Sequence, residues 1–259
     1  VPAGSALTAV DEVDAPGTRI AVTGGAAYCL WLERNLRHAT LMPAASLPAA
    51  ELAQLIGARL ELPEAHGGAQ EPASVRGISI DSRSVQPGDL YAALPGARFH
   101  GAGFAAAAIG SGAAAVLTDQ AGLQLMLDEG PLSVPVIVAA VPREHMGQIS
   151  AALYGGSEDE RARMPLFGVT GTNGKTTTTY FLNSIQKALG RTTGLIGTIE
   201  ILAGDQRIPS LLTTPEAPSV HALLAVMREA GMTGASMEVS SHALEFLSLI
   251  HISEPTRPR

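Results

Sequence analysis

A glycine-containing loop carries the strongest chemical signal in the sequence. It reads Thr170-Gly-Thr-Asn-Gly-Lys-Thr-Thr177 and lies between an apolar segment, 166–170, and a helix predicted over 175–189. Glycines let the backbone close round phosphate oxygens, and the N–H groups at the start of a helix point at the bound anion. Lys175, one of only two lysines in the chain, would neutralise phosphate charge, and the hydroxyl of Thr176 would reach Mg²⁺. The loop therefore predicts a site for a nucleotide with Mg²⁺.

The loop differs from the general phosphate-binding pattern at one position. That pattern requires a glycine five places before the second glycine, whereas residue 169 is Val and the first glycine is Gly171. An ordinary glycine turn that caps a helix is the alternative interpretation. The strand before the loop, the helix after it and the scarce lysine favour a variant phosphate-binding loop.

The same loop resembles that of the ATP-dependent Mur ligases, and other motifs extend the resemblance over about residues 45–245. Three motifs resemble the N-terminal, UDP-binding domain shared by the MurE and MurF types of this family: Asp81-Ser-Arg83, Pro87-Gly-Asp-Leu90 and Ala93-Leu-Pro-Gly96. Two motifs resemble the MurE type specifically: Leu212-Thr-Thr-Pro-Glu216 and Met237-Glu-Val-Ser-Ser-His-Ala-Leu244.

The resemblance implies a reaction. Ligases of the MurE type add meso-diaminopimelate or L-lysine to UDP-N-acetylmuramoyl-L-alanyl-D-glutamate in peptidoglycan synthesis. ATP phosphorylates the substrate carboxylate, and the incoming amine attacks the resulting acyl phosphate. The protein then mainly positions groups and neutralises charge. The implied cofactors are ATP and Mg²⁺, and the implied partners are the UDP-muramoyl-dipeptide and the diamino acid.

The resemblance also implies residue roles, assigned on matching positions. The implied catalytic residues are Lys175 and Glu238, and the implied metal ligands are Thr176 and Glu238. ATP would be held by the residues of the glycine loop: Gly171, Thr172, Asn173, Gly174, Lys175, Thr176 and Thr177. The UDP-muramoyl-peptide would be held by residues of four short segments: Ile80, Ser82, Ala97, Arg98, Phe99, Thr213, Thr214 and Ser240.

Several of these residues also have an ordinary structural interpretation. Glu238 is expected to end a strand beside the strand before the glycine loop, where it would suit Mg²⁺ or form a salt bridge. Asp81 taken alone is more typical of an Asx turn than of a ligand. Without the family, the hydroxyls of Thr213, Thr214 and Ser240 would be interpreted as loop caps, and His242 receives no role.

Three other functions remain open. A MurF-type ligase shares the N-terminal motifs but not 237–244. A simple P-loop kinase or NTPase would leave the motifs at 81–96 unexplained, and binding of the UDP-muramoyl substrate would separate it from a ligase. The non-enzyme alternative is a module that binds a nucleotide or UDP-sugar without catalysis.

Alternating patterns predict an α/β fold with two domains. Strands are expected at 75–80, 89–94, 114–118, 134–141, 166–170, 193–199 and 234–239, and helices at 46–57, 103–110, 143–154, 175–189 and 219–230. Leu182, Ile185 and Leu189 would form the apolar face of the helix after the glycine loop. The charge-rich segment 157–163 is expected to be a solvated linker. Residues 42–160 would form the UDP-substrate domain, and 161–246 the first part of a parallel-sheet ATPase domain.

Composition narrows the class of protein. The 259 residues include 46% hydrophobic residues, which excludes global disorder, and the formal net charge of -7 argues against broad nucleic-acid binding. The single Cys29 excludes an internal disulfide framework. The most apolar stretch, Phe104 to Leu117, is short and interrupted by glycines, so no membrane insertion is expected. We expect a cytoplasmic monomer.

The two ends of the chain are treated separately. We expect the natural protein to start at Met42 and residues 1–41 to be upstream read-through, and a genuine N-terminal extension is the alternative. The run from Leu247 to Arg257 resembles the direct translation of a sequencing-library adaptor, so 247–259 is expected to be an artefactual tail. The family's carbamylated lysine and amino-acid-binding domain would then lie beyond residue 246, and the fragment alone is expected to be inactive.

Overall fold

The computed structural model describes residues 19–22, 40–43, 46–63, 73–155, 158–204, 206–208 and 216–239. The chain divides into two compact units, with residues 43–153 in one and 154–259 in the other. Within the first part of the chain, β1 (Arg19–Val22) and β2 (Thr40–Pro43) form a two-stranded sheet. No element had been expected there.

The unit that contains residues 43–153 is built on a five-stranded sheet. Its strands are β4 (Arg59–Glu61), β6 (Gly77–Ser79), β7 (Asp89–Ala92), β8 (Ala115–Thr118) and β9 (Val136–Val138), in the order β4-β9-β8-β7-β6. All neighbours are parallel except β4, which runs antiparallel to β9. Two short strands, β3 (Leu47–Pro48) and β5 (Ser74–Val75), form a separate antiparallel pair. This confirms the predicted α/β class.

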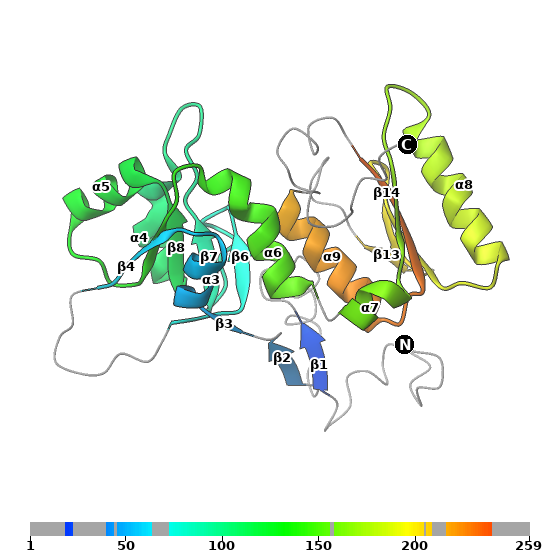
Figure 1. The fold of residues 1–259 in the computed structure, drawn as a ribbon, viewed down its shortest axis with the longest axis horizontal. Coiled ribbons are helices and arrows are strands. Elements are labelled where there is room, and N and C mark those ends of the chain that lie inside the picture. The colour runs from blue at the N-terminus through cyan, green and yellow to red at the C-terminus, as the bar shows by residue number, and fades with distance from the viewer. Residues whose placement is uncertain are drawn as a thin grey trace. The chain divides into compact units, whose positions relative to one another are not determined.

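Helices alternate with these strands along the chain (Figure 1). They are α3 (Ala49–Leu55), the short helix η1 (Gly101–Phe104), α4 (Ala105–Gly110), α5 (Gln120–Glu129), η2 (Pro142–His145) and α6 (Met146–Tyr154). The core joins strand residues such as Tyr91 and Val116 to Leu123 and Met126 of α5. Neither α5 nor β4 was predicted, because α5 lacks a strong apolar period and β4 is only three residues long.

The second unit contains the other five-stranded sheet. Its strands are β10 (Leu166–Val169), β11 (Thr193–Ile196), β12 (Ile201–Ala203), β13 (Gln206–Ile208) and β14 (Gly234–Glu238), in the order β10-β14-β11-β12-β13. The first three strands in this order are parallel, and β12 and β13 add an antiparallel extension that the sequence did not predict. The helices of this unit are α7 (Glu158–Arg163), α8 (Lys175–Ala188) and α9 (Ala217–Glu229).

Helices α8 and α9 cover opposite faces of this sheet (Figure 1). Alternate residues of β14 point to the two faces, since Ala235 and Met237 pack with α9 whereas Ser236 accepts a hydrogen bond from Gln186 of α8. The α9 face is apolar and includes the fully buried Met227. The α8 face is polar.

Two expectations about this unit were wrong. Segment 157–163 was expected to be a linker, but α7 occupies 158–163 as a helix whose residues 161–163 are exposed. The predicted apolar face of α8 does not point inward, because Ile185 and Leu189 are 56% and 74% exposed. The helix instead buries Thr179, Asn183 and Gln186 against the sheet.

Asp89, at the start of β7, is a buried carboxyl group. It is 1% exposed, its Oδ2 accepts the backbone N–H of Gln86 at 2.9 Å, and its Oδ1 has no hydrogen-bond partner among the described residues. Burial raises the pKa of this carboxyl to about 6. The folded chain therefore holds the Asp89 proton more tightly than the unfolded chain does, and stability falls as pH rises from about 4 to about 6.

Replacement Asp89→Asn should remove this pH dependence, because the amide is neutral at every pH and its oxygen can still accept the Gln86 N–H. At pH 8 the variant should be more stable than the parent by up to about 3 kcal/mol, and at pH 4 the two should be similar. Urea unfolding at both pH values measures the difference. Asp128→Asn, at an exposed carboxylate, is the matched control. Equal pH profiles for the parent and Asp89→Asn would contradict the prediction.

Candidate functional site

The loop between β10 and α8 has a backbone that requires glycine at two positions. Gly171 and Gly174 have φ of 141° and 80°, a conformation that residues with a side chain rarely adopt. Gly174 is also the N-cap of α8 and provides no side-chain cap for the first turn of the helix. The N–H groups of that turn are consequently open to an anion.

Lys175 lies over the loop that precedes it. Its Nζ donates to the carbonyl oxygen of Gly171 at 2.8 Å and approaches that of Thr172 at 3.4 Å. The ammonium is thus held at the loop rather than extended into solvent along the helix. A positive charge at this place suits the phosphates that the sequence predicts here.

Glu238 contacts the first turn of α8, because the strand that it ends is the neighbour of the strand before the glycine loop. It ends β14, which runs parallel to β10 with Val169 opposite Glu238. Its Oε2 accepts the Thr176 hydroxyl at 3.0 Å. The structure thus brings these two predicted metal ligands together, 62 residues apart in sequence.

Thr198 is a third contact of this carboxylate, and the sequence did not single it out. The Thr198 hydroxyl donates to Oε2 of Glu238 at 2.9 Å, and its backbone N–H donates to Oε1 at 3.2 Å. Among the described residues, the partners of Glu238 are therefore hydroxyl and amide donors. No local pattern signalled it, because 193–199 was expected to be strand throughout, whereas β11 ends at Ile196.

A hydrogen bond from α8, with an exposed ion pair beside it, supports the turn that carries Thr198. The Tyr180 hydroxyl donates to Oε1 of Glu200 at 2.7 Å, and Nε of Arg207 lies 2.9 Å from Oε2 of Glu200. Burial, and then the hydrogen bond to Glu200, raise the pKa of Tyr180 to about 12. Tyr180 therefore remains a donor at any ordinary pH.

The donor set fits Mg²⁺ only together with other oxygen ligands. Thr176 and Glu238 offer a hydroxyl and a carboxylate, the hard oxygens that Mg²⁺ prefers. The described residues contain no group of three or more His, Cys, Asp and Glu side chains that could hold a metal. Such a pair suits an ion whose other ligands are phosphate oxygens and waters.

The first unit holds the other predicted site residues in two loops. Ile80 and Ser82 follow β6, and Ala97, Arg98 and Phe99 follow β7. Because β6 and β7 are parallel neighbours, both loops leave the same edge of the sheet. Ile80 and Ser82 are half-buried, and 97–99 are exposed, with Phe99 at 74%. Thr213, Thr214 and Ser240 lie outside the described residues.

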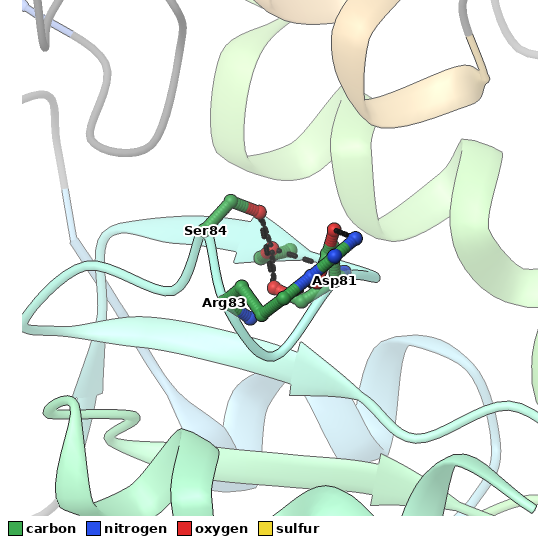
Figure 2. Close-up of polar contacts among 4 residues, drawn as sticks. Asp81, Arg83 and Ser84 are labelled. Carbon is green, nitrogen blue, oxygen red and sulfur yellow. Dashed lines mark hydrogen bonds and ion pairs between the residues drawn. The ribbon is translucent and has the colours of Figure 1, made fainter.

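Asp81 organises the loop after β6 as an Asx turn, as expected. Its Oδ1 accepts the backbone N–H of Arg83 at 3.0 Å, and its carbonyl oxygen accepts the N–H of Ser84 at 3.0 Å. Figure 2 shows the Arg83 guanidinium folded back onto the carboxylate, with Nε 2.9 Å from Oδ1 and a second nitrogen 2.7 Å from Oδ2. These hydrogen bonds from Arg83 lower the pKa of Asp81.

Two family models match the chain. The first, "Mur ligase family, catalytic domain", matches residues 74–164, and the second, "Mur ligase middle domain", matches residues 169–256. They cover the loops after β6 and β7 and the glycine loop from its first residues onward.

Curated relatives match at high identity. A UDP-N-acetylmuramoyl-L-alanyl-D-glutamate--2,6-diaminopimelate ligase of Streptomyces avermitilis is 49% identical over 197 residues, which are 76% of this chain and 36% of the relative. A UDP-N-acetylmuramyl-tripeptide synthetase of Leifsonia xyli is 45% identical over the same length. The chain thus spans about a third of the length of these relatives.

Solved structures show the same fold. A structure of a UDP-N-acetylmuramoyl-L-alanyl-D-glutamate--2,6-diaminopimelate ligase aligns with a TM-score of 0.56 at 26% identity, over 80% of this chain and 38% of the other. None of the described helices is long and apolar enough to cross a membrane.

Replacements at the Asx turn should separate its backbone hydrogen bond from its ion pair. Asp81→Ala should lower the free energy of unfolding by about 1 kcal/mol, because the Arg83 N–H loses its acceptor. Asp81→Asn should retain most of the parent's free energy of unfolding, since Asn forms the same turn. Arg83→Ala should remain near the parent, because the arginine side chain is 87% exposed. Chemical denaturation measures all three, and a larger loss for Arg83→Ala than for Asp81→Ala would contradict this assignment.

Proposed function

Because the chain belongs to the Mur ligase family, we propose that its glycine loop binds ATP with Mg²⁺ in a ligase of the MurE type. The reaction proposed is amide-bond formation between UDP-N-acetylmuramoyl-L-alanyl-D-glutamate and a diamino acid. The names of the relatives at 48% and 49% identity favour 2,6-diaminopimelate over L-lysine as that amino acid.

One observation carries this proposal: the hydrogen bond of 3.0 Å between Thr176 and Glu238 beside the glycine loop. It joins the two oxygen ligands proposed for Mg²⁺ at the point where the N–H groups of α8 begin. An ordinary glycine turn that only caps a helix gives no reason for a strand-end carboxylate to face the helix start.

The residues of the site have distinct proposed roles. The loop N–H groups and Lys175 bind the phosphates and offset their charge. Thr176 and Glu238 hold Mg²⁺, which when bound supplies positive charge to the phosphate oxygens. The loops after β6 and β7, with Ile80, Ser82 and 97–99, would bind the UDP part of the other substrate. Transfer of the phosphoryl group from ATP to the carboxylate of that substrate then depends on how the protein positions the two substrates. The protein itself forms no covalent bond to either of them.

Binding of ATP is the first test, because the chain spans about a third of the length of its relatives and binding needs only the loop. Lys175→Ala should weaken binding of ATP with Mg²⁺ by about 10-fold or more, as expected for the loss of a charge-assisted hydrogen bond. Isothermal titration calorimetry measures it. Lys187→Ala is the matched control, since it removes the only other lysine, in the last turn of the same helix.

Equal effects of the two lysine replacements, or no binding by the parent chain, would contradict the proposed site.

A separate titration with UDP-N-acetylmuramoyl-L-alanyl-D-glutamate distinguishes a ligase from a simple P-loop NTPase. Arg98→Ala should weaken that binding while leaving ATP binding unchanged, because Arg98 and the glycine loop belong to different units.

A further inference from the structure

The turn between β11 and β12 makes direct contact with the proposed metal ligand. Thr198, two residues after the end of β11, donates its hydroxyl and its N–H to the two oxygens of Glu238, at 2.9 and 3.2 Å. With the Thr176 hydroxyl, the carboxylate accepts three hydrogen bonds. Because donors of fixed position contact both oxygens, the Glu238 carboxylate has one orientation.

The turn itself leaves little freedom for this contact. The Gly197 N–H donates to the Glu200 carbonyl oxygen at 3.0 Å and closes the turn. A Cβ at Gly197 would lie 3.0 Å from Oε1 of Glu238, which is too close for an ordinary contact. The absence of a side chain at 197 therefore lets the turn approach the carboxylate.

Helix α8 fixes this turn from the side of the glycine loop. Tyr180 lies one helical turn after Thr176 and donates to Glu200, whose side chain is 16% exposed. The helix thus contacts Glu238 through Thr176 and the turn through Tyr180. Arg207 of β13 pairs with the same glutamate, but the arginine is 80% exposed and so contributes less.

The geometry points to Thr198 as a positioning residue of the nucleotide site. It orients the Glu238 carboxylate toward Mg²⁺, and the Tyr180–Glu200 hydrogen bond holds the turn that carries it. This inference rests on the proposed function. Groups that hydrogen-bond a metal ligand typically change metal affinity by about 10- to 100-fold when they are removed.

Metal dependence of nucleotide binding tests this role. Thr198→Val removes the hydroxyl but keeps the shape and the backbone N–H, and Thr198→Ser keeps the hydroxyl. We expect Thr198→Val to raise the Mg²⁺ concentration needed for half-maximal ATP binding by about 10-fold, and Thr198→Ser to stay near the parent. Metal-free ATP binding should be the same in all three. Tyr180→Phe should act in the same direction with a smaller effect.

Thr178→Val is the matched control, because Thr178 is an exposed threonine of α8. An unchanged Mg²⁺ midpoint in Thr198→Val would overturn the inference. So would equal impairment by Thr198→Ser, or a parallel loss of metal-free ATP binding, since either result would indicate a general structural role.

A second measurement needs no ligand. In the parent chain, hydrogen exchange of the Thr198 amide should be slow, and it should become about 10-fold faster in Glu238→Ala and measurably faster in Tyr180→Phe. In Thr198→Val the amide should stay protected, because its N–H still has Glu238 as acceptor. Fast exchange of the Thr198 amide in the parent, or an exchange rate that Glu238→Ala leaves unchanged, would overturn the inference. If the parent binds no ATP, the proposed function fails, and the exchange rates alone then decide whether Thr198 positions Glu238.

Discussion

Val169 and Glu238 lie opposite each other at the carboxyl ends of two hydrogen-bonded parallel strands, and the N–H of Val239 continues the ladder to the Val169 carbonyl at 2.8 Å. This pairing of β10 with β14 brings the glycine loop and the carboxylate to one edge of the sheet. The second parallel neighbour, β11, adds the turn with Thr198 at the same edge. Every group of the proposed nucleotide site therefore depends on the register of three strands.

The sequence was sufficient to predict the local part of this arrangement. An apolar run, a glycine loop and a helix with Lys175 at its start are contiguous, and their order alone gave β10, the loop and α8 nearly at their observed bounds. The place of Glu238 beside this loop followed from the family resemblance and from the rule that parallel strand ends share an edge. Thr198 was missed because its importance comes from a contact 40 residues distant, which no local pattern encodes.

The orientation of α8 could not be predicted from its apolar residues. Periodicity favoured Leu182, Ile185 and Leu189 as the inward face, but Thr176 and Tyr180 contact Glu238 and Glu200, and the helix buries Thr179, Asn183 and Gln186. The sheet beneath it offers small or polar positions, such as Gly234, where a Cβ would meet Gln186, and Ser236. Gln186 uses its amide to donate to Ser236 at 2.9 Å, while buried oxygens of Thr179 and Asn183 find no partner among the described residues. Burial of unpaired polar atoms is unfavourable, so this inner face of α8 stabilises the unit less than an apolar face would.

The φ of 80° at Gly174 has a consequence for how this loop can change over generations. Besides glycine, asparagine and aspartate tolerate this backbone best. A glycine codon reaches asparagine only through two base changes, and single changes lead to alanine, valine, serine, arginine, cysteine, tryptophan, glutamate or aspartate. Of these only aspartate suits the backbone, and it would place a negative charge where phosphates are proposed to bind. No single base change in the Gly174 codon therefore gives an uncharged residue that suits this backbone.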